Sequence, residues 1–114
     1  MAIKNFTITN STQTAFTCPS GEYVLTPIYI TNYSGAAVQV NVFIVNNSGG
    51  TGTANLSTCV YRNHTINSDD TYVIDLEKII LANAAGTGDF IAANVGGHAN
   101  ANANVTMTIS YASV

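Results

Sequence analysis

Apolar and polar residues alternate most regularly along residues 23–47. Two segments there keep their aliphatic side chains on a single face, namely Ile28 and Ile30 in the first and Val38, Val40, Val42 and Ile44 in the second. Because successive side chains of a strand point to opposite faces, this period of two predicts two strands, each with one face in a core. Ser34 and Gly35 between them favour a turn, so we expect the two strands to form a hairpin.

The opposite face of this predicted hairpin also carries large residues, namely Tyr29, Tyr33, Phe43 and Val45. Apolar and aromatic side chains gathered on the solvent side of a sheet are typical of a protein–protein contact surface. We therefore expect this row to bind another subunit. Ile3 and Phe6, in the N-terminal segment, are further candidates for such contacts.

Other strands are predicted from shorter segments, at residues 59–66, 71–76, 90–95 and 105–112, while residues 2–9 alternate imperfectly and residues 12–17 are short and rich in Thr. Turns separate the strands at intervals of about 8–12 residues, a spacing typical of an antiparallel β-sandwich. Residues 77–82 fit either the end of a strand or a helical turn. We expect an all-β sandwich of about seven or eight strands, with immunoglobulin-like and jelly-roll topologies both open.

With 114 residues the chain is long enough for one core but not for two. We expect residues 20–114 to form the sandwich, and residues 1–19 to form a first strand or an extended arm. Pro27 cannot donate a ladder hydrogen bond, so its strand is expected to be an edge strand or to contain a bulge near Thr26. The Gly- and Ser-rich segment at residues 48–58 is expected to be the most flexible loop.

Charged residues make up only 8% of the chain, against about 25% in a typical domain. Their place is taken by 15 threonines and 14 asparagines, which favour strands and turns respectively. With a net charge of −3 and only three Lys and Arg residues, the chain lacks the basic patch that binds nucleic acid or an anionic membrane. Such sparse charge suits a surface that is buried in an assembly.

No apolar run has the length of a transmembrane helix, and the N-terminal residues lack the features of a signal peptide. We therefore expect a chain that is either made in the cytoplasm or already processed, and Met1 favours the first. In that compartment Cys18 and Cys59 are expected to be reduced rather than paired.

Residues that bind nucleotides or metals are not grouped in the sequence. The glycines precede strands and lack a P-loop lysine. His64 and His98 have no partner at metal-ligand spacing, and we expect each to be a surface or interface histidine. Asp69 and Asp70 are adjacent rather than alternating, which favours turn capping over calcium binding.

The sequence does not support a pair of catalytic residues either. Cys59 and His64 are five residues apart in one predicted strand, so they point to opposite faces and cannot form a dyad. Asp75 and Glu77 lie on the side of their strand opposite its apolar row, where solvated side chains belong. We expect a non-enzymatic protein without a cofactor or a metal.

Several short motifs follow one another in a recognisable order. They are I-x-I-x-N-x-S-G at residues 28–35, V-x-V-x-V-x-I-V at 38–45, T-x-V-I at 71–74, G-D-x-I-x-A at 88–93 and V-T-x-T-I-S-Y at 105–111. Over residues 20–114 the chain resembles the small β-sandwich virion proteins of tailed bacteriophages, which include capsid decoration (cement) proteins and some neck or tail accessory subunits. The long turn at residues 84–89 and the loop at 48–58 depart from that pattern.

The resemblance implies a non-enzymatic subunit on the capsid surface of the virion, made in the host bacterial cytoplasm. It would bind the major capsid protein or other virion subunits, form trimers or dimers, and stabilise the assembled shell. A neck or tail accessory subunit, a fibre subunit and a glycan-binding adhesion module stay open as alternatives. The lack of Trp, the usual stacking platform for sugars, counts against the last of these.

Overall fold

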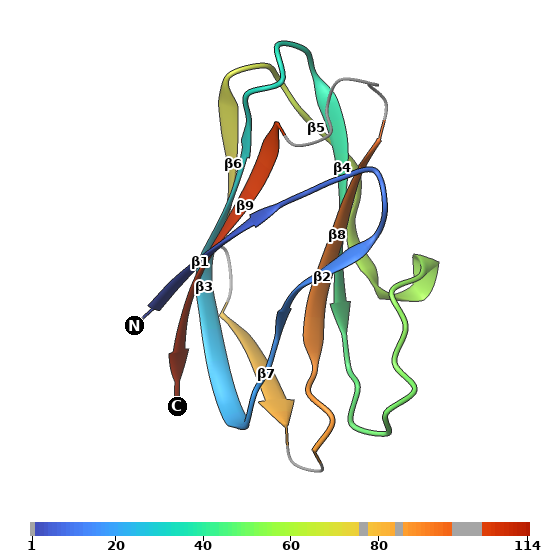
Figure 1. Cartoon of the computed structure of the whole chain (residues 1–114), viewed down its shortest axis with the longest axis vertical. Helices are drawn as coiled ribbons and strands as arrows, with labels where there is room; N and C mark the ends of the chain where they lie inside the picture. Colours follow the sequence, from blue (N-terminus) through green and yellow to red (C-terminus); the bar gives the residue numbers. More distant parts are fainter. Residues whose placement is uncertain (1, 76–77, 84–85, 97–103) are drawn as a thin grey trace.

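Nine strands and one short 3-10 helix are found in the part of the chain that this computed structural model describes, residues 2–75, 78–83, 86–96 and 104–114. In chain order they are β1 (Ala2–Thr7), β2 (Gln13–Thr17), β3 (Gly21–Asn32), β4 (Val38–Val45), η1 (Leu56–Thr58), β5 (Cys59–Ile66), β6 (Asp70–Ile74), β7 (Ile79–Asn83), β8 (Phe90–Gly96) and β9 (Val105–Ser113). The predicted all-β sandwich is confirmed (Figure 1). The additional strand is β7, in the segment that the sequence left ambiguous.

The strands form two antiparallel sheets. Sheet A has the order β1-β9-β3-β6, with β7 also paired to β3, and sheet B has the order β2-β8-β4-β5. Pairing is nested along the chain, because β1 pairs β9, β2 pairs β8, β3 pairs β6 and β4 pairs β5. This arrangement is a jelly roll, so the structure decides between the two topologies that the sequence left open.

The predicted hairpin at residues 23–47 is wrong. β3 and β4 belong to different sheets, and residues 33–37 carry the chain from one layer to the other (Figure 1). The inward rows were nevertheless assigned correctly, since Ile28, Ile30 and Val40 are fully buried. Alternation identifies the buried face of a strand, but it does not identify the neighbour to which that strand is hydrogen-bonded.

Pro27 lies in a bulge at the centre of sheet A, not in an edge strand. The register between β3 and β9 shifts between Leu25 and Ile28. These two residues are both fully buried although they are three positions apart, because the extra residue of the bulge resets the alternation. On its other side β3 pairs with β7 before the bulge and with β6 after it.

The core lies between the sheets and is mostly aliphatic. Its largest members are Ile8, Leu25, Ile28, Ile30, Leu81, Ile91, Met107 and Ile109. Phe16, Tyr23 and Tyr111 join the two sheets where β2 faces β3 and β9, with ring centroids 4.7 Å apart for Phe16 and Tyr111.

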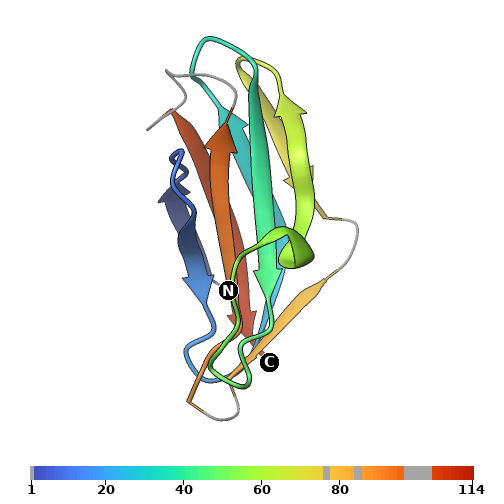
Figure 2. The same ribbon diagram turned by 90° about the vertical axis from the view of Figure 1, so that its right-hand side faces the viewer.

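Of the two alternatives for the N-terminal segment, the structure shows strands rather than an extended arm. β1 extends sheet A and β2 extends sheet B, and Ile8 between them is fully buried. Figure 2 shows both strands along the same side of the sandwich.

Asn32 is the buried polar residue of the described chain. Its Nδ2 donates to the carbonyl oxygens of Ala36 at 2.8 Å and Ile66 at 2.9 Å, and its Oδ1 accepts from the backbone N–H of Ser34 at 3.0 Å. Because Ile66 ends β5 of sheet B, this one amide ties the end of β3 to the crossing segment and to the opposite sheet.

Asp69 and Asp70 form the turn that the sequence predicts between β5 and β6. The backbone N–H of Asp70 donates to Asn67 O at 3.2 Å, and Asp69 has a φ of 60°. The Asp70 carboxylate accepts from the backbone N–H of Thr71 at 2.9 Å, which confirms the capping interpretation.

Gly88 lies where the chain entering β8 passes the residues that follow β2. A Cβ at Gly88 would lie 2.2 Å from the carbonyl oxygen of Cys18. Because that atom belongs to the main chain, we expect Gly88→Ala to lower the free energy of unfolding by about 3 kcal/mol. Gly49→Ala is the matched control, since the nearest atom to its Cβ would be Thr51 Oγ1 at 3.9 Å. Urea denaturation checks both, and equal midpoints for the two variants would contradict the close approach.

Candidate functional site

The candidate contact residues of the N-terminal half lie in two environments. Ile3 and Tyr29 are 68% and 37% exposed and lie on the outer face of sheet A, the face turned away from sheet B. Tyr33 is 51% exposed and follows the end of β3. Phe6 points inward and is only partly buried against the core, in the edge strand β1.

Phe43 and Val45 contradict the expectation that they are exposed. Both lie on the outer face of β4, as the alternation predicts, but they are only 6% and 1% exposed. They form a second small cluster with Ala92, against which Ala54 and Phe90 pack. The segment between β4 and β5 covers this end of sheet B (Figure 2). Neither side chain is open to a partner.

The covering segment, residues 46–58, is held by side chains of its own residues. Asn55 caps η1, because its Oδ1 accepts from Ser57 N at 2.9 Å while Thr58 Oγ1 accepts from Asn55 N at 2.9 Å. Asn47 Oδ1 accepts from Gly52 N at 2.9 Å. The expectation of a flexible loop rested on Gly and Ser content, and the Asn and Thr side chains of the same loop satisfy part of its backbone.

Asp89 joins this segment to both sheets. One carboxylate oxygen accepts from Asn47 N at 2.8 Å and the other from Ala82 N at 3.1 Å. Its backbone N–H donates to Ala82 O at 3.0 Å, and its carbonyl accepts from Cys18 N at 2.9 Å. The G-D pair at residues 88–89 is therefore a structural junction.

The outer face of sheet A carries hydroxyl and apolar side chains in rows across the strands. One row consists of Thr7, Thr106, Thr31 and Thr71, and the next of Asn5, Thr108, Tyr29 and Val73. The Thr31 and Thr71 hydroxyls lie 3.1 Å apart, and the Thr108 hydroxyl donates to Asn5 Oδ1 at 2.9 Å. None of the eight side chains in these two rows carries a charge. We call these two rows, together with Ile3 and Ile80, the neutral face.

Two exposed residues of the neutral face were not predicted from the sequence. Val73 is 38% and Ile80 is 58% exposed. Val73 sits on the outward side of β6, where only the inward Tyr72 and Ile74 had been considered. Ile80 lies in the run at residues 79–81, in which three successive aliphatic residues conceal the period of two.

The outer face of sheet B differs, because its polar residues are bonded to one another. Asn41 Nδ2 donates to Asn94 Oδ1 at 2.7 Å, and Asn94 Nδ2 donates to Thr12 Oγ1 at 2.7 Å. Asn41 Oδ1 accepts from the backbone N–H of Asn63 at 2.8 Å. One end of this face is covered, and the exposed large apolar side chains of this layer are Leu56 in η1 and Val60 in β5, at 72% and 51% exposed.

His64 belongs to an aromatic cluster that bridges the two sheets. Its ring centroid lies 3.9 Å from that of Tyr72, and Tyr61 meets Tyr72 edge-on at 5.7 Å. Burial, followed by the influence of Tyr61 and Asp75, raises the pKa of Tyr72, so its hydroxyl stays neutral at physiological pH. His64 thus packs at an inter-sheet contact, and His98 lies outside the described residues.

Within the described residues, the groups considered for catalysis do not converge. Cys59 belongs to the outer cluster under the loop, whereas His64 packs toward sheet A, so the two face opposite ways as expected. Cys18 and Cys59 are both free. Asp75 is exposed, and Glu77 lies outside the described residues. Within the described ranges no group of three or more His, Cys, Asp or Glu residues is placed to hold a metal, and no helix is long and apolar enough to cross a membrane.

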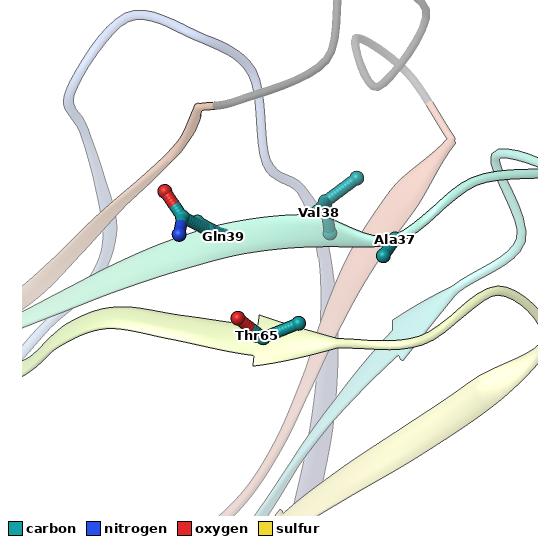
Figure 3. A pocket seen from close by; sticks show the side chains of 4 residues that line it. All are labelled: Ala37, Val38, Gln39 and Thr65. Carbon is teal, nitrogen blue, oxygen red and sulfur yellow. The ribbon is translucent and has the colours of Figure 1, made fainter.

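Two hollows on the described surface have uncharged linings. Ala37, Val38, Gln39 and Thr65 line one of about 290 Å³, where β4 begins and β5 ends (Figure 3). Ala2, Tyr23, Tyr111, Ala112 and Ser113 line another of about 310 Å³. Neither lining includes a carboxylate or a histidine that would serve as a general base.

Comparisons of this chain with models of known protein families, with curated proteins and with solved structures find no match. The candidate site is therefore defined by geometry, as an open sheet face on which Ile3, Tyr29, Val73 and Ile80 are exposed and whose two Thr-containing rows carry no charge.

Proposed function

We propose that this chain is a non-enzymatic structural protein of a tailed-bacteriophage virion, and specifically a capsid decoration protein that binds and stabilises the assembled shell. The neutral face of sheet A carries this proposal. Ile3, Tyr29, Val73 and Ile80 on that face are each more than a third exposed. Exposed apolar side chains that share one face of a sheet support a protein-binding surface on that face.

The chemistry of the face favours a protein partner without charge at the contact. Threonine hydroxyls and tyrosines tolerate burial when they find hydrogen-bond partners, whereas an unpaired charge brought against them would lose its hydration without compensation. The three Lys and Arg residues of the chain are too few to bind the phosphates of nucleic acid. A neutral surface of the major capsid protein is the partner that we propose.

Stabilisation of the shell follows from mass action and needs no catalytic group. A subunit that binds the assembled shell but not the dissociated capsid protein shifts the equilibrium toward assembly. At a free concentration about 100 times its Kd, each bound subunit contributes about 2.7 kcal/mol.

The jelly-roll fold is consistent with a virion structural protein. Jelly rolls are found in viral capsid domains, and also in lectins and cupins. Because one fold serves many functions, this support is an analogy, and it also keeps a glycan-binding module as an alternative. A neck, tail or fibre subunit differs from a decoration protein only in the virion surface to which it binds.

Copy number in purified virions tests the proposal. We expect quantitative mass spectrometry to find this chain in numbers comparable to those of the major capsid protein, which serves as the internal standard. A few copies per particle would instead support a neck, tail or fibre subunit. Absence from the particle, together with binding on a glycan array, would contradict the virion function and support the adhesion module.

A further inference from the structure

Strand β1 leaves one edge of sheet A without a hydrogen-bonded neighbour in the part of the chain that the structure describes. Its 6 residues pair with β9 without a register shift, from Ala2 with Tyr111 to Thr7 with Thr106. β1 ends the strand order of its sheet, and Figure 2 shows it along one side of the sandwich. A regular edge without proline is a template for pairing with another strand.

The remaining edges are interrupted or short. The register of β5 on β4 shifts twice, and Asn63 within β5 has a φ of 52°. The register of β2 on β8 shifts between Thr14 and Phe16. β6 and β7 have 5 residues each and share one side of β3. Bulges, short strands and inward-pointing charges all protect an edge from pairing. β1 has neither a bulge nor a register shift, and Lys4 is its one charged residue.

The main-chain groups of alternate β1 residues point to the open edge. The Ile8 N–H donates to Val105 O at 2.8 Å. Hydrogen-bonded and non-hydrogen-bonded pairs alternate along an antiparallel ladder. Since Ile8 is in a hydrogen-bonded pair, the even-numbered residues of β1 are the ones that bond to β9. The N–H and C=O groups of Ile3, Asn5 and Thr7 therefore point away from β9, toward solvent.

We propose that β1 pairs with β1 of a second copy of this chain, antiparallel about a two-fold axis at Asn5. In this register Asn5 lies opposite its own counterpart, and Ile3 lies opposite Thr7 of the second copy. All the residues that point to the open edge then form hydrogen-bonded pairs, which exchange about six bonds in total. The same segment serves on both subunits, as a two-fold interface requires.

Lys4 selects this register among the possible ones. It is the only charged residue of β1 and lies on the inward side of the strand with Phe6. In the proposed register the stem and ammonium of Lys4 lie over Phe6 of the second copy. An axis at Lys4 would instead place the two lysines directly opposite, with Cα atoms about 4.5 Å apart, and the like charges would repel.

Pairing of this kind joins the two A sheets into one, and the neutral face then continues across the two-fold axis. The inference goes beyond the proposed function, because it depends on the edge of β1 and not on which virion surface the neutral face binds. It remains testable on the purified chain.

Sedimentation equilibrium of the full chain tests the pairing. We expect a monomer–dimer equilibrium in the high micromolar range. Thr7→Pro removes an N–H that points to the open edge and not to β9, so it is expected to preserve the fold and weaken the dimer at least about tenfold. Thr7→Val keeps the N–H and is the matched control. A wild-type chain that stays monomeric would overturn the proposal, as would a Thr7→Pro variant that dimerises like wild type with an unchanged circular dichroism spectrum.

Disulfide cross-linking in a Cys59→Ser background tests the register. Across a hydrogen-bonded antiparallel pair the Cα atoms lie about 5.5 Å apart, within the range of a disulfide. Asn5→Cys is therefore expected to form cross-linked dimers on mild oxidation, and Lys4→Cys is not. Cross-linking of Lys4→Cys would overturn the register, and no cross-link from either variant would overturn the pairing of β1 with itself.

Discussion

Replacing Asn32 with aspartate is expected to lower the free energy of unfolding by about 4 kcal/mol at neutral pH. The amide is fully buried, and its nitrogen donates to the carbonyl oxygens of Ala36 and Ile66. A carboxylate of the same shape has no N–H group. One of its oxygens would therefore face the two carbonyl oxygens without a hydrogen bond to either. Urea denaturation of the purified variant at neutral pH measures the loss.

The loss is expected to depend on pH. Burial and the two facing carbonyl oxygens raise the pKa of the introduced carboxyl in the folded state above its unfolded value of about 3.9. The variant is therefore least destabilised below pH of about 3.9, where the protonated carboxyl can donate one hydrogen bond. Its stability falls, relative to wild type, as the pH rises toward the folded-state pKa.

Asn55→Asp is the matched control for this substitution. Asn55 caps η1 on an exposed segment, where an aspartate caps as well as an asparagine does. We expect its free energy of unfolding to stay within about 0.5 kcal/mol of wild type. If the two variants were equally stable at neutral pH, the role of Asn32 at the junction of the sheets would be wrong.

Phe43→Ser and Tyr29→Ser are expected to separate stability from binding. Phe43 is 6% exposed under the covering segment, so its truncation is expected to cost about 3 kcal/mol. Tyr29 is 37% exposed on the neutral face, and its truncation is expected to cost less than about 1 kcal/mol. Thermal denaturation of the two purified variants checks this order.

The effect of Tyr29→Ser on binding is expected to be larger than its effect on stability. Tyr29→Ser should reduce association with assembled shells while its melting temperature stays close to that of wild type, as co-sedimentation with undecorated shells would show. Thr87 lies off the neutral face, and Thr87→Ser is a suitable control for the assay. Undiminished shell binding by Tyr29→Ser would count against the neutral face as the contact surface.

Strand positions and inward faces were readable from the chain because both depend on local geometry. Val38, Val40 and Val42 alternate with polar residues, and all three are buried. β7 was left ambiguous because residues 79–81 are all aliphatic. The bulge at Pro27 was foreseen as one of two alternatives, since a missing N–H is a property of the residue itself.

The candidate site was predicted only in part, for a reason that Phe43 and Tyr29 illustrate. Both alternate to the outward side of their strands, and nothing within either strand distinguishes them. One is buried because residues 46–58 return over β4, and the other stays exposed because no described segment covers that part of sheet A. Whether an outward side chain meets solvent depends on a segment distant from its own strand.

Composition and alternation were enough to establish an all-β sandwich, a nearly uncharged surface and the inward rows of the main strands. The tertiary structure decided that β3 and β4 belong to different sheets, that the pairing is that of a jelly roll, and that the open neutral face is on sheet A. The physical reason is that side-chain alternation depends on the backbone of one strand, whereas strand pairing and cover depend on contacts between residues far apart in the chain.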